Sequence, residues 1–125
     1  MTSCSPLHER VVGEITSFGE EAAITVPASV TQGKPFEVTV ITAGGGCMEQ
    51  GDTEVKVQGP RAEITPYDYE IVPIGGGCTL IGQDYLHTAT LSFAEKGTAT
   101  ITFYGREQTA DGATPTTEVR TLEVR

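Results

Sequence analysis

The feature that most constrains the fold is a strict alternation of apolar and polar residues, which begins near residue 22. Phe36, Val38 and Val40 alternate with Glu37 and Thr39, for example. A period of two is typical of a β-strand with one buried face. Comparable segments recur along the chain, and we predict seven strands over residues 24–26, 36–40, 53–58, 62–72, 89–93, 99–103 and 119–124.

The composition of these segments supports the same fold class. Val, Ile, Thr and Tyr dominate them, and these residues suit a pleated, half-buried surface. No segment has the pattern of a helix long enough to cross between parallel strands. The sequence therefore predicts an all-β protein, an immunoglobulin-like antiparallel β-sandwich of about seven strands. A closed eight-stranded barrel is the alternative.

The residues between the strands predict how they are connected. Glu95-Lys96-Gly97 is a three-residue connection with Gly, so we predict that the strands 89–93 and 99–103 form a hairpin. Residues 105–116 are polar and predict a loop. Residues 1–20 show no clean period and predict an N-terminal tether with at most one short edge strand. The predicted organisation is a tether over 1–20 and one sandwich domain over 21–125.

The alternation also predicts which side chains face the core. Val55 and Val57 are expected to point inward. Tyr67 and Tyr69 lie on one strand and are expected in the core with their hydroxyls at its rim, the alternative being a surface for carbohydrate or peptide. His87 shares the face of the apolar residues that follow it, and we expect it at the rim of the core.

The charge of the chain excludes some classes of partner. Seventeen Asp and Glu against eight Lys and Arg give a net charge of −9. Such a surface repels phosphate backbones, so we expect no nucleic-acid partner. No apolar run of transmembrane length is present, and association with a membrane is expected through an anchor rather than a span.

Two of the three cysteines end the same tetrapeptide, Gly-Gly-Gly-Cys, at Cys47 and Cys78. If the strand before Cys47 runs upward, the next runs down and the third up, so both cysteines fall at one end of the sandwich. We therefore predict a Cys47–Cys78 disulfide, which stabilises a loop of this length by roughly 3–4 kcal/mol. The alternative is two free buried thiols. The spacing fits no zinc pattern, and we expect no metal and no cofactor.

The third cysteine lies close to the N-terminus. Thr2-Ser3-Cys4 resembles the end of a bacterial lipoprotein signal, in which two small residues precede the lipidated Cys. The resemblance implies lipid attachment at Cys4 and export to the periplasm or outer membrane. Ser5 is similar to the residue that permits sorting to the outer membrane in enteric bacteria. The expected contact with the membrane is this lipid anchor.

The residues needed for catalysis are sparse. The chain has two histidines, His8 in the tether and His87, and no serine in a nucleophile-elbow motif. A disulfide-bonded Cys cannot act as a nucleophile. We therefore expect a protein that is not an enzyme.

The predicted topology places several loops at the end that carries the cysteines. Their acids could bind Ca²⁺ in an adhesion module, although loop acids that simply face solvent are the alternative. We predict that any protein partner in the cell envelope binds these loops, with contributions from Glu49, Asp52, Gly75, Gly76, Gly77, Asp84, Arg106 and Asp111.

Two resemblances bear on the function. The segments 30–40 and 95–103 resemble the strand and turn patterns of bacterial immunoglobulin-like domains, which implies a fold rather than an activity. The segment 74–77 and Tyr104-Gly105-Arg106-Glu107 are similar to the Gly-rich and Arg-containing loops of chagasin-like inhibitors of cysteine peptidases. The expected function is a non-enzymatic structural or binding module of an envelope lipoprotein. Inhibition of a cysteine peptidase is the alternative.

Overall fold

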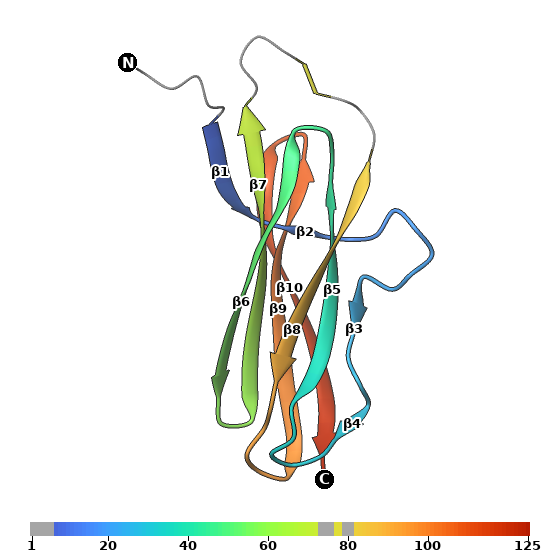
Figure 1. The fold of residues 1–125 in the computed structure, drawn as a ribbon, viewed down its shortest axis with the longest axis vertical. Coiled ribbons are helices and arrows are strands. Elements are labelled where there is room, and N and C mark those ends of the chain that lie inside the picture. The colour runs from blue at the N-terminus through green and yellow to red at the C-terminus, as the bar shows by residue number, and fades with distance from the viewer. Residues whose placement is uncertain (1–6, 73–76, 79–81) are drawn as a thin grey trace.

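The computed structural model describes residues 7–72, 77–78 and 82–125. Two β-sheets pack face to face, and the described residues contain no helix. This confirms the predicted all-β sandwich, with ten strands in place of about seven. The strands are β1 (Leu7–Val12), β2 (Glu14–Ile15), β3 (Ile24–Thr25), β4 (Ser29–Val30), β5 (Phe36–Gly44), β6 (Met48–Gln58), β7 (Arg61–Val72), β8 (Gln83–Leu91), β9 (Gly97–Thr109) and β10 (Gly112–Val124) (Figure 1).

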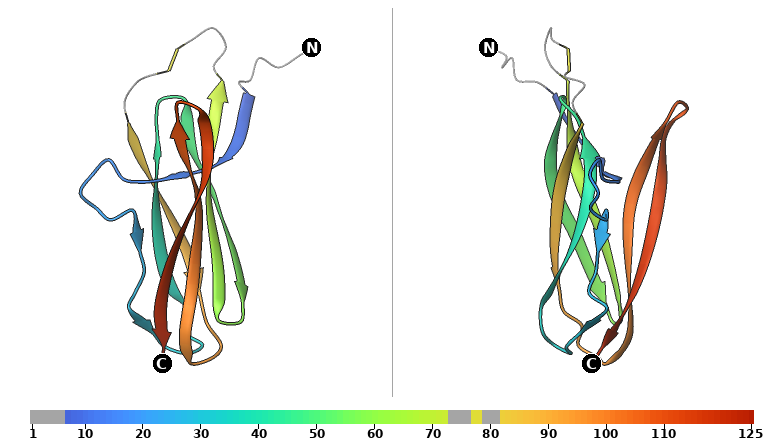
Figure 2. Two further views of the ribbon diagram at one scale, coloured as in Figure 1. Left: turned by 180° about the vertical axis from the view of Figure 1, so that it is seen from behind. Right: turned by 90° about the vertical axis from the view of Figure 1, so that its right-hand side faces the viewer.

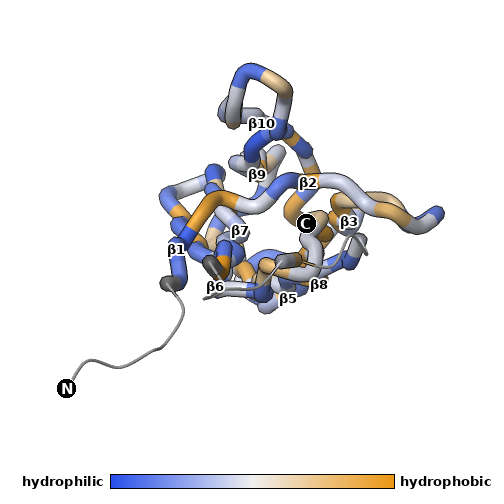
Figure 3. The backbone as a smooth tube through the Cα atoms, turned by 90° about the horizontal axis from the view of Figure 1, so that it is seen from above, coloured by the Kyte–Doolittle hydropathy of each residue, from blue (hydrophilic) through white to orange (hydrophobic). Residues whose placement is uncertain are grey.

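The first sheet has the order β1-β7-β9-β10-β4, and β6 pairs with β7. In the second sheet β5 pairs with β2, β3 and β8. Seen along the strands, β9 and β10 lie on the opposite side of the molecule from β5 and β8 (Figure 3). Most pairs are antiparallel, but β7 with β9 and β10 with β4 are parallel.

The N-terminal segment is part of the sandwich from Leu7 onward. β1 pairs with β7 in the first sheet, and β2 pairs with β5 in the second. Between them the Gly13 N–H donates to the carbonyl of Pro66 at 2.8 Å. The prediction for residues 1–20 was a tether with at most one short edge strand, whereas residues 7–15 contain two strands, one in each sheet. Strands of two to six residues are too short to show a clean period, so backbone pairing alone reveals them.

The predicted hairpin between residues 89–93 and 99–103 is also wrong. β8 pairs with β5, whereas β9 pairs with β10 and β7. The connection through Glu95-Lys96-Gly97 thus passes from one sheet to the other. Alternation identifies the buried face of a strand but not its neighbour, so two successive strands of a sandwich can look like a hairpin.

The predicted loop over residues 105–116 is instead the far half of a long hairpin. β9 and β10 stay paired along their whole length, from Gly97 opposite Val124 to Thr109 opposite Gly112. Their upper part diverges from the other strands (Figure 2). Beyond Arg106 most of its residues are exposed on both faces, so no apolar alternation marks these strands in the sequence.

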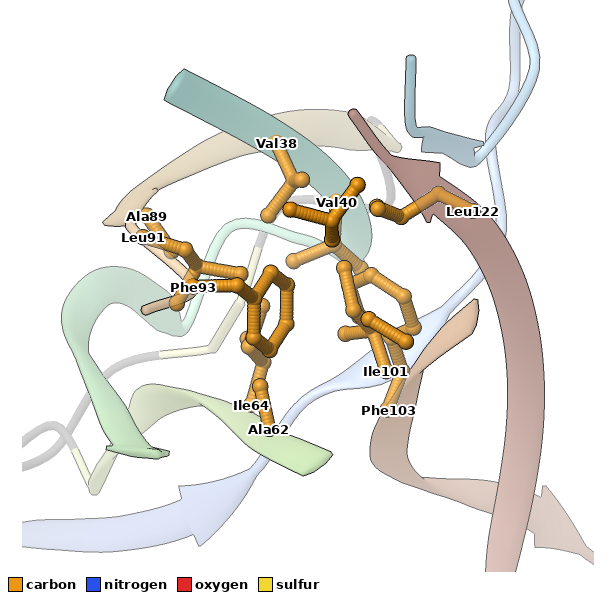
Figure 4. Close-up of a cluster of buried hydrophobic side chains, with 12 residues drawn as sticks. Val38, Val40, Ala62, Ile64, Ala89, Leu91, Phe93, Ile101, Phe103 and Leu122 are labelled. Atoms are coloured by element: carbon orange, nitrogen blue, oxygen red, sulfur yellow. The ribbon is translucent and has the colours of Figure 1, made fainter. Parts of the chain in front are cut away.

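The core lies between the lower halves of the two sheets. Phe103 and Ile101 of β9 meet Val38 and Val40 of β5, and all four are at most 1% exposed (Figure 4). The core also contains Ala62, Ile64, Ala89, Leu91, Phe93, Ala99, Leu122 and Val124.

Val55 and Val57 point to the predicted face but are not buried. They pair with Ile64 and Ala62 and so lie on the core face of the sheet, yet they are 36% and 47% exposed. β6 is an edge strand, and the second sheet does not cover these two side chains.

Candidate functional site

The end of the sandwich that carries the cysteines is held by the predicted disulfide. Cys47 and Cys78 are bonded, with their Cα atoms 5.2 Å apart, which is typical of disulfides. The carbonyl of Cys47 also accepts a hydrogen bond from the Ile71 N–H at 2.8 Å, and this bond connects the disulfide to β7. Disulfides persist in oxidising compartments, so the bond fits an extracytoplasmic location.

The predicted acidic residues lie at this end but do not converge. Asp84 accepts hydrogen bonds from Ser17 Oγ at 3.1 Å and from the Phe18 N–H at 3.0 Å. Glu49 lies 4.0 Å from His8, and Asp111 is exposed in the turn between β9 and β10. Within residues 7–72, 77–78 and 82–125, no three His, Cys, Asp or Glu side chains could hold a metal together.

Arg106 lies within β9 and not in a loop, contrary to the prediction. It is half-buried, and its Nε donates to the carbonyl of Val12 at 2.6 Å. Its two Nη atoms bind Glu70 and Gln108, at 3.4 and 2.9 Å. Arg106 therefore ties the hairpin to β1, so it is not presented as the arginine of an inhibitory loop would be.

The glycines of the predicted loop are mostly outside the described part of the chain. Gly77 is exposed, and a Cβ atom at its position would contact nothing within 4 Å. Gly75 and Gly76, like Cys4, lie outside the described residues.

A buried polar network joins the two sheets beneath the disulfide end. Asp68 of β7 accepts a hydrogen bond from Thr42 Oγ1 of β5 at 2.6 Å, and its other oxygen lies 2.9 Å from His87 Nε2 of β8. The opposite ring nitrogen, Nδ1, is 2.8 Å from Thr53 Oγ1 of β6. We call these four residues the buried network.

One arrangement of hydrogens satisfies every contact of the buried network. A carboxylate only accepts hydrogen bonds, so a hydrogen on Nε2 of His87 is the one that can be donated to Asp68. In a neutral ring Nδ1 then accepts a hydrogen bond from the Thr53 hydroxyl. The side chains of Asp68 and His87 are both 0% exposed. A Thr–His–Asp chain is thus present, but its His and Asp are closed off from solvent.

The sequence prediction missed Asp68 because it placed the flanking Tyr67 and Tyr69 in the core, which assigns Asp68 to the opposite face. In the structure Ile64, Pro66 and Asp68 form one buried row. Tyr67 and Tyr69 therefore point to the outer face, and their predicted place in the core is wrong. His87 is fully buried, not at the rim, because Asp68 and Thr53 satisfy its ring nitrogens. An unbroken alternation through Pro66 was the signal that could have found the pair.

The outward tyrosines form part of a surface feature, which we call the arginine–tyrosine patch. It consists of His8, Arg10, Asp52, Tyr67 and Tyr69. The Arg10 guanidinium stacks 3.5 Å above the ring centroid of Tyr67, and His8 meets the edge of Tyr69. Arg10 donates to both oxygens of Asp52, with Nε at 3.1 Å and Nη2 at 2.6 Å.

Local backbone geometry and charge explain this arrangement. A bulge between Gln50 and Thr53 places Asp52 beside Arg10. The hydrogen bonds from Arg10 lower the pKa of the Asp52 carboxyl, and the same bonds raise the pKa of Arg10. A bidentate pair stacked on an aromatic ring limits the conformational freedom of all three side chains.

Two hollows adjoin Arg106 where the hairpin diverges. One, of about 300 Å³, lies between Glu14, Ile15 and Glu118, and the other, of about 280 Å³, lies between Val11, Val12 and Pro115. Both are at the lower limit of the volumes of small-molecule sites.

No known family model matches this chain, and neither a curated protein nor a solved structure is significantly similar to it. In the described part of the chain there is no helix long and apolar enough to span a membrane.

Proposed function

We propose that this chain is a non-enzymatic binding module of the bacterial cell envelope, whose partner is another envelope protein. The observation that carries the proposal is the arginine–tyrosine patch beside the disulfide. Tyr and Arg are the residues that most often dominate the energy of protein–protein contacts. Here Arg10, Tyr67 and Asp52 are already held by one another, so little conformational entropy is lost when a partner binds.

The buried network supports a binding role over catalysis. A catalytic His must reach a substrate, whereas the His87 side chain has no exposed surface. Its hydrogen bonds instead connect β5, β6, β7 and β8 directly beneath the patch and the disulfide. The network therefore acts as a rigid support for the surface above it.

The proposed site differs in part from the loops predicted from the sequence. Asp52 and Glu49 keep their place in it, since Asp52 belongs to the patch and Glu49 lies 4.0 Å from His8. Arg106 contributes indirectly, by holding β1 under the hairpin. The sheet face of β1, β7 and β6 thus replaces the loops as the main surface.

Export and lipid attachment at Cys4 complete the proposal. Only three residue steps separate Cys4 from Leu7, the first residue of β1, and they span at most about 10 Å. β1 begins opposite Val72, at the disulfide end. A lipid on Cys4 would therefore hold the patch close to the membrane surface, and the partner would be a protein that is accessible there.

Site-specific photocrosslinking in the envelope of a lipoprotein-exporting bacterium tests the proposal. A photoreactive residue at Tyr69 should give an adduct of discrete mass, and one at Thr90, exposed on the outer face of the second sheet, should not. Arg10→Ala should abolish the Tyr69 adduct. Absence of an adduct at Tyr69, or equal adducts at both positions, would contradict the proposed surface. A turnover of an envelope substrate that His87→Asn abolishes would contradict the non-enzymatic role.

A further inference from the structure

The lower half of β6 is an exposed edge. In the described part of the chain β6 pairs with β7 and with no other strand (Figure 1). From Thr53 to Gln58 the ladder with β7 is regular, with no bulge or Pro in β6. Exposed, regular edges of this kind can pair with a strand from another chain.

The hydrogen bonds of β7 show which backbone groups of β6 face outward. The carbonyls of Pro60 and Pro66 accept hydrogen bonds from Thr100 and Gly13, which lie on the side of β7 opposite β6. Residues along a strand direct their backbone groups to alternate edges. The even-numbered residues of β7 between these prolines therefore face away from β6, and the odd-numbered ones face it.

The pairing register between β6 and β7 shows which residues of β6 direct their backbone groups to the open edge. Thr53, Val55 and Val57 pair with even-numbered residues of β7, namely Pro66, Ile64 and Ala62. In an antiparallel pair such residues are opposite each other without exchanging hydrogen bonds. The N–H and C=O groups of Thr53, Val55 and Val57 consequently point to the open edge.

The side chains along this edge are self-complementary. Glu54 and Lys56 flank Val55, and on the outer face their charged groups lie 3.3 Å apart. In an antiparallel pairing with a two-fold axis at Val55, Glu54 of one copy is opposite Lys56 of the second copy. Val55 meets its own equivalent, and Thr53 meets Val57, whose side chain is 47% exposed in the single chain.

We infer that β6 pairs with β6 of a second copy of this chain and joins the two sheets into one. Each copy supplies the outward N–H and C=O groups of three residues, which gives about six hydrogen bonds between the strands. The pairing also adds two cross-strand ion pairs and covers the valines at the edge of the core. Because the axis is two-fold, the assembly closes as a dimer.

The other edge of the same sheet provides a matched comparison. β10 carries Glu118-Val119-Arg120, again an acid, a valine and a base, and Val119 is 51% exposed. The residues of β10 whose backbone groups face this edge include Pro115, which has no N–H to donate. The edge is also occupied from Glu123 onward, where β4 pairs with β10. Val119 is the one valine in the uncovered part of β10, whereas β6 carries Val55 and Val57, so β6 offers the more apolar edge.

Charge variants test the inference by sedimentation equilibrium of the full chain over a concentration series. The wild-type chain should dimerise, and Lys56→Glu or Glu54→Lys should each weaken the dimer by roughly tenfold or more, because like charges then face each other. An equimolar mixture of the two variants should dimerise again, since each then faces its opposite charge. The double variant E54K/K56E should dimerise by itself.

Arg120→Glu is the control, because it changes the net charge by the same amount as Lys56→Glu on the other edge. It should leave the dimer unchanged, and circular dichroism should show that all variants are folded. A wild-type chain that is monomeric throughout, or a mixture that does not recover, would overturn the inference. Dissociation by Arg120→Glu but not by Lys56→Glu would do so as well, by assigning the contact to β10. Glu54 also lies 3.9 Å from Nη2 of Arg10, so Lys56→Glu and Arg120→Glu are the variants whose results do not depend on the arginine–tyrosine patch.

Discussion

Replacing Asp68 with alanine tests whether the buried network holds the two sheets together. Asp68 is fully buried and accepts hydrogen bonds from Thr42 Oγ1 at 2.6 Å and from His87 Nε2 at 2.9 Å. The substitution leaves the Thr42 hydroxyl and the His87 N–H without partners in the interior. We therefore expect a loss of stability far above that of an ordinary surface change.

The magnitude follows from the number of groups left unpaired. Each buried donor without a partner costs about 1–3 kcal/mol. Removing one member of a buried ionisable pair typically costs about 3–5 kcal/mol in total. For Asp68→Ala we thus expect the free energy of unfolding to fall by about 3–5 kcal/mol, a large share of the roughly 5–15 kcal/mol of a domain of this size.

Urea unfolding under non-reducing conditions, followed by far-UV circular dichroism, gives this free energy. Asp68→Asn is the matched control, because the amide keeps an acceptor for His87 at nearly the same volume, and it should cost less than Asp68→Ala. In the double variant D68A/H87A the two costs should be clearly less than additive, since His87 no longer leaves an unpaired N–H. A loss below about 1 kcal/mol for Asp68→Ala, or full additivity, would refute the reasoning.

Three further predictions concern the same end of the molecule. Replacing Cys47 and Cys78 together by alanine should lower the free energy of unfolding by about 3–4 kcal/mol, and a reducing agent should then have no further effect on the melting temperature. An NMR titration should place the pKa of Asp52 below its ordinary value of 3.8, and Arg10→Ala should raise this pKa. Because the pKa is lower in the folded than in the unfolded chain, the Arg10–Asp52 pair stabilises the fold above pH 3.8. This contribution is lost as the pH falls through the folded pKa. Gly13→Ala should cost about 1–3 kcal/mol in thermal unfolding, because the added Cβ would overlap the buried network, and an unchanged melting temperature would contradict this packing.

Several features followed from the sequence because they depend on local physics. Alternation predicted the strand that became β5, since burying one face of a strand requires apolar residues at every second position. The Cys47–Cys78 bond followed from counting strand directions between two cysteines, which needs no knowledge of which strands pair.

Other features were decided only by contacts between distant segments. β8 and β9 are consecutive and similar in pattern, yet each pairs with a different sheet, because alternation defines a face and not a neighbour. The far half of the β9–β10 hairpin escaped prediction for a related reason, since strands solvated on both faces need no apolar period.

The candidate site depended on tertiary structure most of all. The full burial of Asp68 and His87 was not predicted, because a buried polar side chain is stable only when a partner satisfies it. Those partners, Thr42 and Thr53, come from other strands of the chain. A sequence shows which residues of a strand share one face. Only the packing of the two sheets brings these four side chains within hydrogen-bonding distance, and it turns the tyrosines beside Asp68 outward.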